Sequence, residues 1–253
     1  MTEAIRPIRL VTFDLYDTLI ELRPPRWERL AAACRSIGLE ADPLVLRAAD
    51  RVSEDFYTVE NGRLPIRDRP VAAQQAFRVE LMRRWLAAAG LPHDRETAQT
   101  LRDAYLSEFD ETPNYRHYRL FDDVMPALRR LRSGGVKTAV VSNADADVTV
   151  ICVHFAFADL MDLIVTSALV GYEKPDSRTF HAALDPLGIA PAHALHIGDQ
   201  PKSDVAGALD IGMRAILLDR YGRHPDSPVP TVPSLTALAD LVLDVPAAVG
   251  ERR

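Results

Sequence analysis

The sequence predicts an α/β fold in which a parallel sheet is covered by helices on both faces and an all-helical segment is inserted. After Pro113, short apolar segments alternate with helical ones, and parallel strands need such long connections. Residues 24–110, by contrast, show only long helical periods rich in Ala, Leu and Arg. We therefore expect a doubly wound, Rossmann-like core at residues 1–20 and 117–253 and a helical domain at residues 21–116.

The core begins with a buried strand that ends in acids. Residues 9–13 form a short apolar run, and Asp14-Leu15-Tyr16-Asp17-Thr18 follows at once. The later strands are expected at residues 136–141, 163–166, 194–197 and 215–218, and the helices at residues 123–132, 147–155, 177–187, 203–211 and 235–243. The Pro-rich stretch at residues 225–233 is typical of a short connector.

Turn-forming residues divide the inserted segment into about four helices. They lie at residues 38–43, 61–65 and 90–92. Four helices can form a small core of their own. Arginines gather between residues 61 and 70, and a solvated surface explains them better than an anion site does.

Composition narrows the class of function. The net charge is −6, so the summed field does not favour nucleic acid or a membrane surface. Cys34 and Cys152 are the only cysteines and lack metal-site spacing, which indicates small buried side chains. Acids interrupt every apolar stretch before it reaches the ~18 residues of a membrane span. We expect a cytoplasmic protein, monomer or homodimer, that acts on a small molecule.

Polar residues follow the predicted strands where a parallel sheet binds ligands, beyond the carboxyl ends. They are Asp14 and Asp17 after the first strand, Ser142 and Asn143 after residues 136–141, Lys174 before a helix, and Asp199 with Asp204 after residues 194–197. Taken singly, each has an ordinary explanation as a cap, a turn former or a surface charge. Together, in this order, they predict one crevice.

The chemistry of such a crevice is specific. Clustered carboxylates repel one another unless a cation neutralises them, and hard oxygen ligands suit Mg²⁺, with Asp14 and Asp199 as its ligands. Lys174 and the Ser142 hydroxyl can hold the oxygens of an anion. A carboxylate beside a metal and a bound phosphate can attack phosphorus and form an acyl phosphate, which predicts Asp14 as the nucleophile.

Four segments of the chain resemble the ordered motifs of the haloacid dehalogenase (HAD) superfamily. They are Val11-Thr12-Phe13-Asp14-Leu15-Tyr16-Asp17-Thr18-Leu19, Val140-Val141-Ser142-Asn143, Glu173-Lys174-Pro175-Asp176, and Ile197-Gly198-Asp199 through Asp204. The resemblance implies that Asp14 is the covalent nucleophile, that Ser142 and Lys174 hold the anion, and that Asp199 and Asp204 serve a Mg²⁺ site. Thr18 would orient the first loop, Thr18 and Asn143 join the anion-binding candidates, and the helical insertion would be a cap.

The first motif departs from the superfamily's phosphatases at one position. Those enzymes carry an acid/base Asp two residues after the nucleophile, and here that position is Tyr16, with Asp17 one residue further. Their metal ligand at that position is a backbone carbonyl, which Tyr16 can still provide. Either Asp17 takes over the proton transfer, or a good leaving group or a cap residue makes a dedicated acid unnecessary.

Two other functions stay open beside a phosphatase. A tyrosine at this position resembles the superfamily's 2-haloacid dehalogenases, whose Asp displaces halide without a metal. The third hypothesis is a weakly active anion-binding protein. The acids at Asp199 and Asp204 favour a Mg²⁺-dependent phosphomonoester hydrolase acting on a phosphorylated metabolite, because a metal-free enzyme gains little from converging carboxylates.

Overall fold

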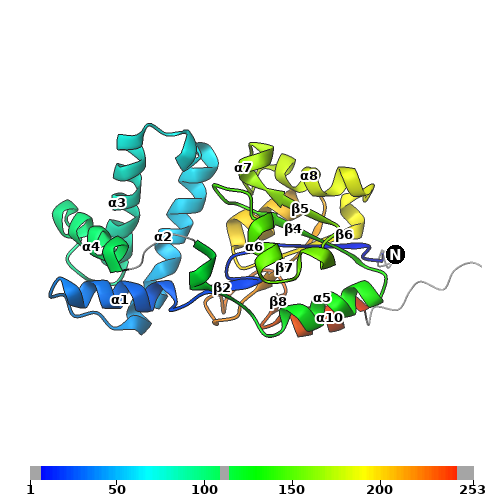
Figure 1. Cartoon of the computed structure of the whole chain (residues 1–253), viewed down its shortest axis with the longest axis horizontal. Coiled ribbons are helices and arrows are strands. Elements are labelled where there is room, and N and C mark those ends of the chain that lie inside the picture. Colours follow the sequence, from blue (N-terminus) through cyan, green and yellow to red (C-terminus); the bar gives the residue numbers. More distant parts are fainter. Residues whose placement is uncertain (1–6, 109–113, 244–253) are drawn as a thin grey trace, which may run out of the picture. The chain divides into compact units, whose positions relative to one another are not determined.

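The computed structural model describes residues 7–108 and 114–243, and the chain forms two compact units. One unit combines Met1–Glu21 with Leu120–Arg253 and holds the large sheet (Figure 1). The other, Leu22–Arg119, is built mainly from helices. Two short strands, β2 (Ile20–Leu22) and β3 (Tyr118–Leu120), pair with each other where the chain passes between the units.

The large sheet has six parallel strands in the order β5-β4-β1-β6-β7-β8. Their bounds are β1 Leu10–Phe13, β4 Lys137–Ser142, β5 Leu163–Thr166, β6 Ala194–Gly198, β7 Arg214–Leu218 and β8 Thr231–Val232. The chain starts in the middle of the sheet and builds outward in both directions, which is the doubly wound topology that the sequence predicts. The predicted fold class is confirmed.

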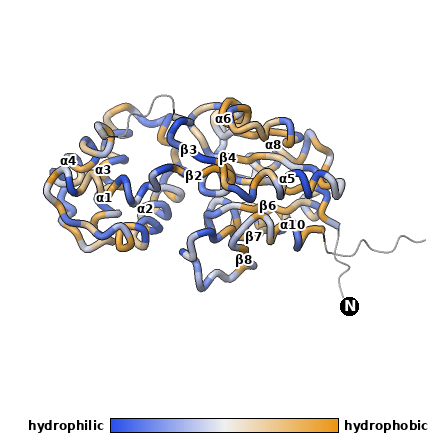
Figure 2. The backbone as a smooth tube through the Cα atoms, turned by 60° about the horizontal axis from the view of Figure 1, so that its bottom comes forward, coloured by the Kyte–Doolittle hydropathy of each residue, from blue (hydrophilic) through white to orange (hydrophobic). Residues whose placement is uncertain are grey.

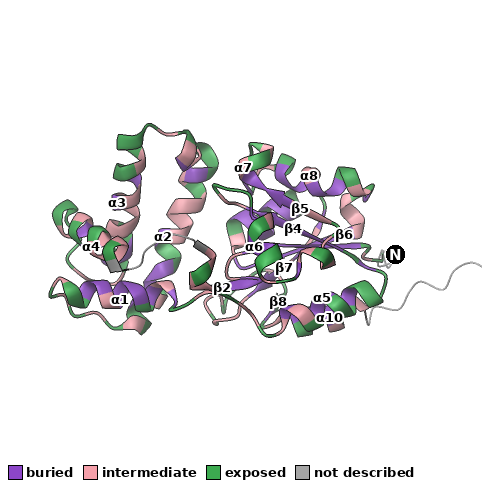
Figure 3. Cartoon of the chain, in the orientation of Figure 1, coloured by how far each residue is buried: buried purple, intermediate pink, exposed green. Residues whose placement is uncertain are grey.

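Helices pack on both sides of this sheet. They are α5 Val124–Ser133, α6 Thr149–His154, α7 Ser167–Val170, α8 Ser177–Leu187, α9 Gly207–Asp210 and α10 Leu235–Leu243. Figure 1 shows α5 and α10 on one side and α7 and α8 on the other. Figure 3 shows the strands buried between them, and Figure 2 shows hydrophobic residues along the inner elements.

Apolar side chains from both layers form the core. Leu10, Phe180, Leu184 and Leu217 are at most 1% exposed and belong to one cluster of the sheet and α8. Burying a side chain of this size stabilises the fold by about 1.5–3 kcal/mol. Cys34 and Cys152 are also fully buried, each within its own unit, as predicted for small apolar side chains.

Local differences from the predicted elements have physical reasons. The helix expected at residues 203–211 instead starts as a π-helical segment, Pro201–Ala206, and continues as α9. Such wide turns often re-aim side chains at functional sites. The connector predicted at residues 225–233 contains β8, whose Thr231 pairs with Leu217. A two-residue strand is too short for periodicity to reveal.

The helical unit contains the four helices that the breakers predict. They are α1 Arg26–Ser36, α2 Pro43–Arg63, α3 Val71–Ala88 and α4 Arg95–Glu108. Helix α2 runs further than expected, through Asn61, whose side-chain oxygen accepts the Ile66 N–H at 2.6 Å. Arg69 donates to the Glu60 carbonyl at 2.7 Å and lies over the Phe77 ring, so it closes the end of α2. No helix among the described residues is long and apolar enough to cross a membrane.

Candidate active site

Three neighbouring strands bring the predicted residues to one edge of the sheet. Phe13 pairs with Val140 on β4 and with Ile197 on β6, so the residues that follow lie at the same level. Asp14 comes directly after β1 and donates its backbone N–H to the Ile197 carbonyl at 2.9 Å. Parallel strands therefore deliver Asp14, Ser142 and Asp199 to a common edge.

Lys174 connects two of the predicted acids. Its Nζ donates to Asp14 Oδ1 at 2.7 Å and lies 2.6 Å from Asp204 Oδ1. All three residues are at least nine-tenths buried, with Lys174 only 2% exposed. Buried charges are stable only when they are paired, so this lysine neutralises part of the acidic cluster.

Burial and neighbouring charges shift the pKa values of Asp14 and Asp204 in opposite directions. Burial raises the pKa of Asp14 to about 6, because Lys174 opposes the shift only in part and the charge of Asp204 adds to it. Burial also acts to raise the pKa of Asp204, but Lys174 and His196 hold it below its usual range. Burial disfavours the ammonium form of Lys174, yet the two carboxylates keep its pKa above the ordinary value.

Asp204 is held from several sides. The backbone N–H of Gln200 donates to Oδ2 at 2.9 Å, and His196 Nε2 lies 3.3 Å from Oδ1. Thr12 Oγ1 lies 2.8 Å from His196 Nδ1, and burial lowers the pKa of the imidazole. These partners assign a neutral ring that donates from Nε2 to Asp204. A Cβ at Gly198 would overlap the Asp204 carboxylate, so glycine permits the close approach.

Asp14, Asp199 and Asp204 together form a group that could hold a cation. Each offers an oxygen, and these oxygens lie within 4.8 Å of one another. The Asp199 carboxylate also accepts from Arg223 Nη2 at 2.8 Å and from Gln200 Nε2 at 3.0 Å, both at Oδ2. An all-carboxylate donor set fits a hard cation such as Mg²⁺ and does not fit a soft one.

Three hydroxyl groups among the described residues are buried without a hydrogen-bond partner, and one of them, Thr179 Oγ1, belongs to helix α8. The other two are Ser142 Oγ at the end of β4 and Thr18 Oγ1 in the loop after β1, both on residues that are 0% exposed. A buried polar group without a partner costs about 1–3 kcal/mol and asks for an explanation. Donors in this position are suited to an anion with several acceptor oxygens.

Asn143 is engaged with the protein backbone. Its Nδ2 donates to the Lys174 carbonyl at 3.0 Å, and its Oδ1 accepts the Lys174 N–H at 2.8 Å. This paired contact positions the lysine loop on the end of β4. The structure thus gives Asn143 a positioning contact, whereas the sequence suggests direct anion binding.

Tyr16 and Asp17 lie in the loop between β1 and β2, and the backbone there is irregular. Tyr16 is half-buried and forms an isolated bridge with Ile20. Asp17 has a φ of 56°, a left-handed conformation that Asp and Asn adopt more readily than most residues, and its N–H donates to the Ile20 carbonyl at 2.7 Å. The loop therefore turns sharply shortly after Asp14.

Three further residues contact these acids, and the sequence does not single them out as site residues. Gln200 lies next to Asp199 inside a recognised motif, and its polarity was the available signal. His196 lies on β6, where its ring packs against Phe180 of α8 and its Nε2 contacts Asp204. Arg223 contacts Asp199 from 24 residues further along the chain, and no local spacing points to it.

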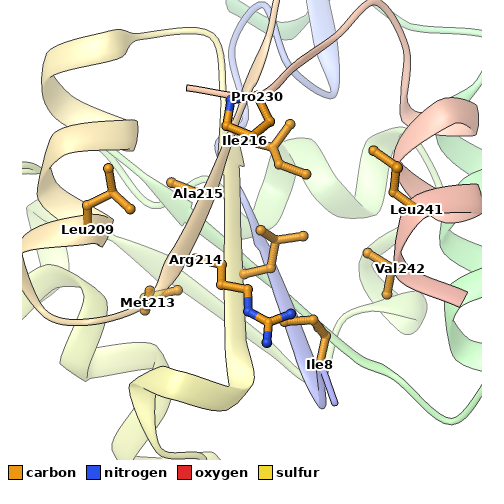
Figure 4. Close-up of a pocket in the computed structure, with 10 residues that line it drawn as sticks. Ile8, Leu209, Met213, Arg214, Ala215, Ile216, Pro230, Leu241 and Val242 are labelled. Atoms are coloured by element: carbon orange, nitrogen blue, oxygen red, sulfur yellow. The ribbon is translucent and has the colours of Figure 1, made fainter. Parts of the chain in front are cut away.

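A separate pocket of about 370 Å³ lies near the start of β6 and β7 (Figure 4). Leu209 faces it from one side and Leu241 and Val242 of α10 from another. Arg214 is the charged residue of its lining, and the acids of the other sheet edge take no part in it. This apolar pocket lacks the groups that hydrolysis requires.

The chain is similar to known proteins in sequence and in fold. A family model described as haloacid dehalogenase-like hydrolase matches residues 8–212. Haloacid dehalogenase-like hydrolase domain-containing protein 3 of Mus musculus is 30% identical over 213 residues, with 83% of this chain and 82% of the relative covered. Ribulose-1,5-bisphosphate 5-phosphatase of Halopiger xanaduensis is 29% identical over 215 residues, with 83% and 84% covered.

A solved structure has a similar fold. The crystal structure of a 2-haloacid dehalogenase from Pseudomonas syringae pv. Tomato DC3000 superposes with a TM-score of 0.54 at 26% identity, covering 94% of this chain and 99% of that one. The motifs of the sequence, the parallel sheet and the family match thus agree. The chain belongs to the haloacid dehalogenase-like hydrolases.

Proposed function

We propose that this hydrolase is a Mg²⁺-dependent phosphomonoester phosphatase that acts through a phosphoryl group carried on Asp14. One observation carries the proposal. Buried carboxylates suited to a hard cation lie at the same sheet edge as the buried, unpartnered Ser142 hydroxyl and the buried Lys174. Cation and anion sites side by side are what hydrolysis of a phosphate ester needs. The phosphatase name of the Halopiger xanaduensis relative supports the same chemistry.

The metal would be held by Asp14, Asp199 and Asp204, with the Tyr16 carbonyl as a further ligand. When bound, Mg²⁺ supplies positive charge that screens the anionic nucleophile from the anionic substrate. Lys174 contributes a fixed positive charge in the same cluster, because it contacts both Asp14 and Asp204.

Asp14 acts as the nucleophile in its ionised form. Lys174 holds Oδ1, so we assign the attack on phosphorus to Oδ2. A bond forms between this oxygen and phosphorus as the bond from phosphorus to the ester oxygen breaks, and the leaving alcohol takes up a proton. Water then attacks the acyl phosphate, releasing inorganic phosphate and regenerating Asp14.

Ser142, Thr18 and Lys174 hold the phosphoryl oxygens. The two hydroxyls are buried and have no partner within the described protein, so they can donate without breaking an existing bond. Donors that are fixed before the substrate arrives cost no reorganisation during the reaction. Asn143 acts indirectly, because its two hydrogen bonds to the Lys174 backbone hold the lysine in position.

Asp17 supplies the proton to the leaving group in this proposal, in place of the acid that Tyr16 replaces. Its loop position, three residues after Asp14, keeps it close in sequence to the reaction centre. The helical unit, Leu22–Arg119, serves as a cap that excludes water and selects among small phosphorylated metabolites. We place the boundaries of this cap between residues 20 and 21 and between residues 116 and 117, as the sequence indicates.

A 2-haloacid dehalogenase is the second candidate, and Tyr16 together with the Pseudomonas syringae structure favours it. In that reaction Asp14 would displace halide from carbon and form an ester, which water would hydrolyse. The acids Asp199 and Asp204 argue against it, because carbon–halogen displacement by a carboxylate needs no cation.

One assay separates these functions. Phosphate release from a panel of phosphomonoesters is measured with Mg²⁺, with a chelator and with the Asp14→Asn variant, alongside halide release from 2-haloacids. A phosphatase releases phosphate only with Mg²⁺ and only when Asp14 is present. Halide release that persists in chelator would instead establish the dehalogenase. Phosphate binding without turnover of any substrate would indicate an anion-binding protein.

A further inference from the structure

Arg223 is a second cation beside the three-carboxylate group, and neither the motifs nor the proposed reaction uses it. Its Nη2 lies 2.8 Å from Asp199 Oδ2, and its side chain is only 7% exposed. The same Oδ2 accepts from Gln200 Nε2 at 3.0 Å. Arg223 therefore sets a full positive charge against one of the acids proposed to hold Mg²⁺.

The loop after β7 fixes this arginine in place. Asp219 Oδ1 accepts the Arg223 N–H at 2.7 Å, and Oδ2 accepts the His224 N–H at 2.9 Å. The Asp219 N–H in turn donates to the Val232 carbonyl of β8 at 2.9 Å. The loop is thus tied to the edge of the sheet, and it directs Arg223 back across the carboxyl end of β6.

The charges of the cluster give this contact a consequence. Asp14, Asp199 and Asp204 carry three negative charges when ionised, and Lys174 and Arg223 balance two of them. A divalent cation then turns the remaining negative charge into one net positive charge, which attracts a phosphate anion. Without Arg223 the loaded cluster would be neutral, and the cation would meet less repulsion.

We propose that Arg223 sets the charge balance of the site, weakening divalent-cation binding and strengthening phosphate binding to the loaded site. This inference rests on the proposed function, because it takes the three carboxylates as the metal site. A residue that only held Asp199 in position would act differently. Its removal would weaken the binding of both the divalent cation and phosphate. Loss of a balancing charge instead changes the two affinities in opposite directions.

The test measures Mn²⁺ binding by electron paramagnetic resonance and inorganic phosphate binding to the Mn²⁺-loaded protein by calorimetry. Arg223→Gln should bind Mn²⁺ about tenfold more tightly and phosphate about tenfold more weakly than the wild type. Arg223→Lys keeps the charge and should stay near the wild type. The matched control is Arg132→Gln, which removes an arginine paired with Asp162 at 3.0 Å beside the start of β4.

Each outcome bears on the inference. Unchanged affinities in Arg223→Gln, or weaker binding of both ions, would overturn it. Arg223→Met is a second neutral variant that reports the same quantities should the glutamine variant fail to fold. If the wild type binds no Mn²⁺, the metal site of the proposed function is wrong. If it binds Mn²⁺ but Arg223→Gln matches it, only the role of Arg223 is wrong.

Discussion

Lys174 Nζ lies 2.7 Å from Asp14 Oδ1, and the lysine side chain is 1% exposed. The same ammonium group reaches Asp204 Oδ1 at 2.6 Å, so a single buried cation holds two carboxylates of the cluster. Acids packed this closely repel one another, and a fixed cation lowers the cost of bringing them together. Stability and chemistry of the site therefore depend on the same contact.

Replacing Lys174 by methionine should destabilise the protein strongly. The change leaves two buried carboxylates without their cation, and breaking a buried pair in this way costs about 3–5 kcal/mol. Urea denaturation in chelator measures the free energy of unfolding. Lys137→Met is the matched control, because Lys137 is exposed at the start of β4. A loss no larger than that of the control would show that Lys174 does not neutralise the cluster.

Ser142→Ala should separate stability from activity. The hydroxyl has no partner within the described protein, so its removal should not lower the free energy of unfolding and should relieve the cost of about 1–3 kcal/mol of burying an unpartnered polar group. A hydrogen bond to a charged phosphoryl group is worth about 1.5–3 kcal/mol, so kcat/KM should fall roughly tenfold to a hundredfold. Ser133→Ala, on the exposed end of α5, is the control. An unchanged kcat/KM would remove Ser142 from the anion site.

Asp14→Asn should stabilise the protein above neutral pH in the presence of chelator. The folded-state pKa of about 6 exceeds the ordinary 3.8, so the folded protein holds this proton more tightly than the unfolded chain does. Ionisation of Asp14 therefore costs stability as the pH rises through this window, by up to about 3 kcal/mol. The asparagine variant avoids that cost.

Thermal denaturation as a function of pH checks this sign. The asparagine variant should unfold at a higher temperature than the wild type near about pH 8, and the difference should shrink below about pH 5. Asp210→Asn, at an exposed position of α9, controls for the loss of one negative charge. A variant that is less stable than the wild type at about pH 8 would mean that the ion pair with Lys174 outweighs the burial of the charge.

Asp17→Asn tests the source of the proton. Asparagine tolerates the left-handed φ of 56° at this position, so the substitution removes the acid while the loop keeps its shape. Activity on an alkyl phosphate should fall about a hundredfold, because its leaving group needs a proton. Activity on an aryl phosphate with a good leaving group should fall much less. Equal losses on both substrates would exclude Asp17 as the acid.

Much of the core could be predicted because its signals are local. A buried strand is a short apolar run, and a polar residue directly after it lies at the carboxyl edge of the sheet. Asp14, Ser142 and Asp199 follow this rule, and the register of β1 with its neighbours brings them to one edge. The fold class and the members of the acidic cluster therefore follow from the chain alone.

Other features depend on contacts between distant segments. The paired strands β2 and β3 are three residues each and come from segments almost a hundred residues apart, so periodicity does not reveal them. Arg223 reaches Asp199 only because Asp219 folds the loop after β7 back on itself. The amide of Asn143 contacts the backbone of Lys174, which lies 31 residues further along the chain. Such partnerships are set by tertiary structure.

Detection of a phosphoryl group on Asp14 tests the proposed reaction most directly. A reaction with a phosphomonoester and Mg²⁺ is quenched in acid during turnover, and the peptide that carries Asp14 is examined by mass spectrometry. The proposed reaction adds one phosphoryl group to Asp14, and this group should be absent in chelator and in Asp14→Asn. Continued phosphate release with no phosphoryl group on Asp14, or with the group on another residue, would contradict it.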